Sequence, residues 1–133
     1  IEQLKKIESV LIEKGKIAKI YNKKFKNEKF IRTPFLPEYV TRHTWYMYCI
    51  KFTKEISRKK IQKILNLKGI DTRLSFPPIH LQPVYKKKFG FKKGDFPISE
   101  EVFDSFLDIP CWKGMGRKNI NYIIKTIQSA IKN

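Results

Sequence analysis

The sequence predicts an α+β domain (an α/β sandwich): a small sheet of about three or four strands with helices packed mainly on one face. Three observations support this fold class. The length of 133 residues fits one domain with a packed core. Apolar residues recur at helical spacing at both ends of the chain, and a run of aromatic and β-prone residues lies between them.

The first predicted helix covers residues 1–25 and has an apolar stripe opposite a face of lysines and glutamates. The stripe consists of Ile1, Leu4, Ile7, Leu11, Ala18, Tyr21 and Phe25. Gly15 lies inside this pattern, and because a glycine costs a helix about 1 kcal/mol relative to alanine, we expect a bend or break there. Beyond this helix, Pro34 and Pro37 predict an extended connection.

Residues 43–52 (HTWYMYCIKF) form the best predicted strand, with bulky residues on both faces and His43 as a partly buried structural residue. Ser57 follows as the expected N-cap of a helix, with Ile56 and Ile61 placed as a hydrophobic staple. Gly69 stands where a glycine ends a helix. Residues 70–76 then predict a second strand of about 5–6 residues.

The remaining elements follow a proline-rich loop. Pro77 and Pro78 end the second strand, and the basic, glycine-punctuated stretch up to about Gly94 is expected to be mobile. Residues 96–107 predict a short helix with Pro97 near its start, and residues 107–110 a brief strand. The closing helix begins near Lys118 and has an apolar stripe of Ile120, Ile123, Ile124, Ile127 and Ile131.

The formal net charge of +17 raises the hypothesis of nucleic-acid binding. However, 24 of the 29 basic residues are lysines, whereas specific phosphate and base recognition favours arginine. A solvated surface is therefore the preferred interpretation. No apolar run approaches the ~20 residues of a membrane span. Cys49 and Cys111 lack metal-ligand spacing, which indicates free thiols in a reducing compartment, by default the cytoplasm.

The segment from Gly69 to Tyr85 (GIDTRLSFPPIHLQPVY) is the candidate binding segment, because its prolines restrict the backbone and lower the cost of ordering it. His80 can form hydrogen bonds, Tyr85 and Phe76 offer flat faces to a base or sugar ring, and Arg73 can pair with a phosphate or carboxylate. In the alternative interpretation, His80 and Tyr85 pack the loop onto the domain and Arg73 is a surface residue. The residues alone leave both open. No nucleophile motif, P-loop or dinucleotide fingerprint is present, so no catalytic residue is predicted.

This segment, followed by FPISEEVFDSFLDIP, resembles the C-terminal part of the pyridoxal-phosphate (PLP)-dependent sugar aminotransferases of the DegT/DnrJ/EryC1/StrS family. HTWYMYCIKF resembles the first strand of the family's small domain, SRKKIQKILNLKGI its next helix, and IEQLKKIESVLIEKGKIAKIYN the long helix that enters that domain. The T-R after G-I-D, with the PIHLQPVY loop, is most similar to perosamine-synthase members acting on GDP-4-keto-6-deoxymannose. The segment CWKGMGRKN lacks the threonine that often caps the family's last helix.

The resemblance implies that residues 1–133 are the C-terminal small domain of a fold-type I enzyme, with 1–25 as a linking helix and 26–133 as the α/β domain. The larger domain, with the Schiff-base lysine, the aspartate facing the pyridine nitrogen and the phosphate cup, matches nothing in this chain. PLP would therefore bind the full-length parent and not this chain alone, and the chain would be inactive by itself.

In that parent, a homodimer, the amino donor (typically glutamate) would aminate a keto-sugar nucleotide for polysaccharide biosynthesis, with Arg73, Phe76, His80 and Tyr85 on the substrate side. Two other functions stay open. One is a basic α+β module that binds nucleic acid. The other is a truncated paralogue that dimerises through the apolar stripe of its first helix.

Overall fold

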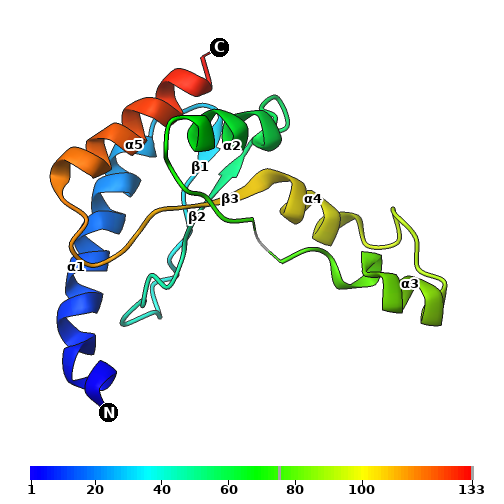
Figure 1. Cartoon of the computed structure of the whole chain (residues 1–133), viewed down its shortest axis with the longest axis horizontal. Helices are drawn as coiled ribbons and strands as arrows, with labels where there is room; N and C mark the ends of the chain where they lie inside the picture. The colour runs from blue at the N-terminus through cyan, green and yellow to red at the C-terminus, as the bar shows by residue number, and fades with distance from the viewer. Residues whose placement is uncertain (75, 133) are drawn as a thin grey trace.

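The computed structural model describes residues 1–74 and 76–132, and it confirms the α+β fold class (Figure 1). Helices from both ends of the chain pack together beside a short sheet (Figure 1). The elements, in chain order, are α1 (Glu2–Phe25), β1 (Ile31–Arg32), β2 (Tyr48–Phe52), α2 (Arg58–Leu67), the 3-10 turn η1 (Ile79–Leu81), α3 (Pro83–Phe89), α4 (Pro97–Ser105), β3 (Phe106–Ile109) and α5 (Arg117–Ala130).

The sheet has the order β1-β2-β3, and both strand pairs are antiparallel. In the register of β2 and β3, Tyr48 lies opposite Ile109 and Ile50 opposite Leu107. Because side chains alternate along a strand, these residues and Phe52 point to one face and form the centre of the core. Cys49 and Lys51 point to the opposite face and are only half-buried.

Helices α1, α2 and α5 supply the rest of the core, with α5 packed against both others. The closing helix begins at Arg117, as its isoleucine stripe predicts, although Gly116 before it provides no side-chain cap. Tyr21 of α1 is fully buried, and its hydroxyl donates to the carbonyl oxygen of Pro110 at 2.8 Å. Burial raises the pKa of this phenol far above its usual value. The contact ties α1 to the segment that follows β3.

Helix α1 differs from its predicted form in two ways. It runs without interruption through Gly15, so the predicted bend is wrong. In addition, only the carboxyl-terminal half of its apolar stripe is buried. Ile17 is 4% exposed, whereas Leu4 is 71% and Ile7 44% exposed. The amino-terminal half of α1 extends beyond the sheet in Figure 1, where the rest of the described chain gives it little to pack against.

The strand predicted at residues 43–52 is shorter, beginning at Tyr48. Trp45 has φ 49°, a left-handed conformation that interrupts an extended strand. His43 is exposed rather than partly buried, and its Nδ1 accepts a hydrogen bond from the backbone N–H of Trp45 at 2.9 Å. The bulky residues before Tyr48 therefore belong to an irregular segment.

The strand predicted at residues 70–76 is wrong for the described residues in that range, and Ser75 lies outside them. They form only an isolated antiparallel bridge between Arg73 and Asp108 of β3. The hydroxyl of Thr72 donates to the side chain of Asn66 in α2 at 3.2 Å, which holds this segment against the helix instead of along the sheet. β1, a strand of two residues, was too short for its pattern to be recognised.

The loop predicted between Pro77 and Gly94 contains η1 and α3 instead. Pro83 occupies the first turn of α3, where a missing N–H costs nothing. Gly90 ends the helix in the left-handed conformation, with φ 73°. The other predicted helices are confirmed: the hydroxyl of Ser57 caps α2 by accepting from the N–H of Lys60 at 3.4 Å. Within the described chain, no helix combines the length and the apolar character needed to cross a membrane.

Candidate functional site

The residues from 76 to 96 form an arm that projects from the sheet beside α4 (Figure 1). We call this segment the arm. α3, within it, has no buried residue, so the arm is held by its own aromatic rings instead of by the main core. The ring centroids of His80 and Phe96 are 4.7 Å apart, and those of Phe91 and Phe96 are 5.5 Å apart in an edge-to-face arrangement. These contacts join the two ends of the arm.

The rings enclose a hollow of about 430 Å³, which we call the aromatic hollow. Its lining is largely apolar and includes two of the residues predicted to contact substrate, His80 and Tyr85. Tyr85 is 42% exposed, whereas His80 is 6% exposed. The full lining is Ile79, His80, Tyr85, Phe89, Phe91, Phe96 and Ser99.

His80 is held at the wall of the aromatic hollow by Glu100 in the first turn of α4. The Nε2 of His80 lies 2.9 Å from Oε1 of Glu100, and both side chains are almost fully buried. The backbone N–H of Gly94 donates to the same oxygen at 2.7 Å. These two hydrogen bonds lower the pKa of Glu100 below its usual value, and the bond from Gly94 has the larger effect. The carboxylate is therefore ionised at neutral pH.

Arg73 lies in a second, smaller hollow of about 240 Å³ that also receives Asp108, Tyr46 and Trp112. The backbone groups of Arg73 and Asp108 exchange hydrogen bonds of 3.2 and 3.0 Å, so the two residues lie opposite each other across an isolated antiparallel bridge. Asp108 is 6% exposed, and neither oxygen of its carboxylate has a hydrogen-bond partner among the described residues. Burial, and the nearby charge of Asp108, raise the pKa of the Cys49 thiol.

The structure thus brings together only two of the four predicted residues. Arg73 lines the second hollow, and Phe76, which is 87% exposed, lines neither. Sequence reasoning missed Glu100 and Asp108. Glu100 looked like an ordinary acidic residue of a first helical turn, whereas Asp108 had a signal, because a charged residue inside the apolar run FLDIP is unusual.

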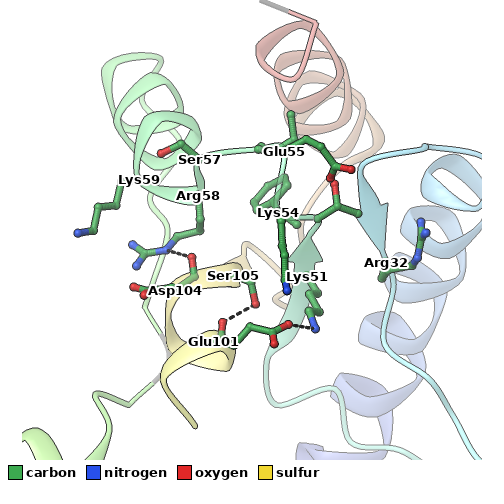
Figure 2. A pocket seen from close by; sticks show the side chains of 13 residues that line it. Arg32, Lys51, Lys54, Glu55, Ser57, Arg58, Lys59, Glu101, Asp104 and Ser105 are labelled. Atoms are coloured by element: carbon green, nitrogen blue, oxygen red, sulfur yellow. Dashed lines mark hydrogen bonds and ion pairs between the residues drawn. The ribbon is translucent and has the colours of Figure 1, made fainter. Parts of the chain in front are cut away.

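A third hollow, of about 670 Å³, lies between the end of β2, the start of α2 and α4, and Figure 2 shows the side chains that line it. Lys51 and Glu101 form an ion pair of 2.9 Å across it. Arg58 is 3% exposed and donates to the carbonyl oxygens of Phe103 and Asp104, both at 3.4 Å. Since these contacts join α2 to α4, the buried arginine has a structural role there.

The described residues do not fit PLP. A Schiff-base lysine needs a protected, water-poor position, and none of the described lysines is buried or lines the aromatic hollow. No group of three or more histidine, cysteine or acidic side chains that could hold a metal ion occurs in the part of the chain that the structure describes. The aromatic hollow itself offers a ligand hydrogen-bonding groups and flat rings.

Comparison with known proteins identifies the fold's relatives. The model of the DegT/DnrJ/EryC1/StrS aminotransferase family matches residues 1–128. The chain belongs to this family. Helicobacter pylori PseC, an aminotransferase involved in the biosynthesis of pseudoaminic acid, superimposes with a TM-score of 0.89 at 18% sequence identity, which supports the shared fold. The superposition covers 98% of this chain and 35% of that protein.

Curated relatives in sequence show the same partial coverage. An uncharacterised protein of Methanocaldococcus jannaschii is 34% identical over 134 residues, covering 98% of this chain and 34% of the relative. The spore coat polysaccharide biosynthesis protein SpsC of Bacillus subtilis is 27% identical over 136 residues (99% and 35%). The GDP-perosamine synthase of Escherichia coli O157:H7 is more distant, at 24% identity over 127 residues (96% and 33%). The chain spans about a third of the length of these relatives.

Proposed function

We propose that this chain is the C-terminal small domain of a PLP-dependent nucleotide-sugar aminotransferase and forms one wall of its substrate site. Residues 1–25 link it to a larger domain, and residues 26–133 form the small domain itself. The larger domain holds the cofactor, because the lysines described here do not fit that role. The parent enzyme works in the cytoplasm as a homodimer, takes the amino group from a donor such as glutamate, and serves polysaccharide biosynthesis.

The observation that carries this proposal is the extent of the family match. It covers residues 1–128, nearly the whole chain, yet this chain is only about a third as long as its relatives, at 34% of the first. The exposed apolar side chains on the amino-terminal half of α1 agree with a missing neighbour, since apolar patches of this kind mark surfaces that another body covers. The resemblance of the Gly69 to Tyr85 segment favours a GDP-linked 4-keto-6-deoxy sugar as the substrate.

In this proposal the chain binds and orients the substrate. His80 and Tyr85, at the aromatic hollow, contact the sugar or base by a hydrogen bond and a ring face. Arg73, in the second hollow, pairs with a phosphate group. Phe76, which lies between Arg73 and His80 in the sequence, contributes an exposed ring. Binding energy from such contacts positions the ketone for the cofactor in the larger domain.

The test uses the complete protein that contains this chain, with PLP, glutamate and a panel of keto-sugar nucleotides. His80→Ala should raise KM for the nucleotide sugar about fivefold to tenfold, the effect of losing one hydrogen bond. His43→Ala is the matched control, because His43 is exposed and does not line the aromatic hollow. Both variants are checked for an unchanged unfolding temperature. If His80→Ala leaves KM unchanged, His80 does not contact substrate; if no amino transfer occurs with any nucleotide sugar, the function itself is wrong.

A further inference from the structure

Glu100 connects the two ends of the arm at the point where they meet α4. It accepts hydrogen bonds from the backbone N–H of Gly94 at 2.7 Å and from Nε2 of His80 at 2.9 Å. It is 9% exposed and His80 is 6% exposed, so water does not compete strongly for either contact. An ionised carboxylate has no proton to give, and it can only accept.

This contact determines which nitrogen of His80 carries the proton. In a neutral imidazole one nitrogen donates and the other accepts. Because Glu100 accepts from Nε2, the single proton of the neutral ring lies on Nε2, and Nδ1 of that form presents a lone pair. Nδ1 forms no hydrogen bond with any of residues 1–74 and 76–132. It is also not fully buried, because the fully buried side-chain atoms without a partner do not include it. This nitrogen is therefore available to a ligand.

We propose that Glu100 is a positioning residue that holds His80 in the Nε2–H form, so that Nδ1 accepts a hydrogen bond from a hydroxyl group of the bound sugar nucleotide. This inference rests on the proposed function and deepens it, since it specifies the chemistry that His80 recognises. A ligand group that only accepts hydrogen bonds, such as a ketone oxygen, is not matched by Nδ1 of the neutral ring. Tyr85, on the same hollow, adds a ring face and a hydroxyl.

The geometry also shows why Glu100, and not the adjacent Glu101, can position His80. Glu100 and Glu101 are consecutive on α4, but Glu101 points to the third hollow, where it pairs with Lys51. The hydrogen bond from Gly94 fixes the carboxylate independently of His80, so the imidazole docks against a group that is already oriented. The substitution Glu101→Ala is therefore the matched control for Glu100→Ala, because it removes a neighbouring carboxylate without touching His80.

The first experiment determines the tautomer of His80 directly. The 133-residue chain contains only two histidines, so nitrogen chemical shifts of both rings can be assigned by NMR at a pH where the imidazoles are neutral. His43 is an internal reference, because its Nδ1 accepts from Trp45 and its proton therefore also lies on Nε2. In Glu100→Ala no acceptor remains for Nε2–H, so the His80 signals should shift from the Nε2–H form toward a mixture of the two neutral tautomers. Glu101→Ala should leave them unchanged.

The second experiment measures amino transfer by the complete protein. Glu100→Ala should raise KM for the nucleotide sugar about fivefold, as His80→Ala does, and the double variant should be no worse than His80→Ala alone. Retained thermal unfolding separates this result from loss of fold. An unchanged His80 tautomer in Glu100→Ala, or additive effects in the double variant, would refute the positioning role. If the tautomer shifts but the complete protein has no aminotransferase activity, the proposed function and the sugar ligand are wrong. In that case only the positioning of His80 by Glu100 is supported.

Discussion

The two halves of α1 should respond differently to the same substitution. Ile7 and Ile17 belong to one predicted apolar stripe, yet Ile17 is 4% exposed in the core and Ile7 is 44% exposed. Replacing a buried isoleucine by alanine removes about 2–5 kcal/mol from the free energy of unfolding. For a chain of 133 residues this corresponds to a drop of roughly 7–18 °C in Tm. Ile7→Ala should change stability by no more than about 0.5 kcal/mol, because alanine's helix propensity offsets the small burial lost.

Thermal and urea unfolding of both variants, followed by circular dichroism, measures the difference. The comparison is then repeated in the complete protein. If α1 is the helix that enters a larger domain, Ile7 becomes buried there, and Ile7→Ala should then cost about as much as Ile17→Ala. Equal losses in the isolated chain would refute the packing described for α1. An Ile7→Ala effect that stays small in the complete protein would refute the linking role of residues 1–25.

Two further predictions concern single residues. Gly15→Ala should stabilise the chain by about 1 kcal/mol, because α1 is continuous there and an added Cβ meets no atom within 4 Å; a loss of stability on urea unfolding would show that the helix bends in solution. The pKa of Glu100 lies below its usual 4.5, so its contribution to folding is complete above that pH and is lost as the pH falls through the lowered value. The stability gap between the wild type and Glu100→Gln should therefore narrow on acidification below about pH 4.5, and a gap that widens would contradict the ionised pairing.

The helices could largely be predicted from the sequence, because each depends on a pattern along its own length. The isoleucine stripe of α5 and the Ser57 cap of α2 are local features, and the structure confirms both helices. The strands were harder to predict, because a strand exists only where a partner pairs with it. Residues 70–74 have strand-forming composition but meet β3 at the single position Arg73.

The candidate site also has features that the sequence predicts and features that depend on the tertiary structure. The unusual prolines and the histidine of the Gly69 to Tyr85 segment singled it out in the sequence, and its resemblance to sugar aminotransferases agrees with the family match. That His80 is buried, and that Tyr85 shares its hollow, depends on how the arm folds back onto α4. Glu100 lies 20 residues from His80 in the chain, and no local pattern relates the two.

The sequence by itself determined the fold class, the four longer helices α1, α2, α4 and α5, and the family, because spacing, capping and motif are properties of consecutive residues. Only the tertiary structure decided which half of the α1 stripe is buried, which predicted strand finds a partner, and which nitrogen of His80 is free. Burial and pairing depend on contacts between residues distant in the chain. Those contacts form only when the elements pack together and exclude water.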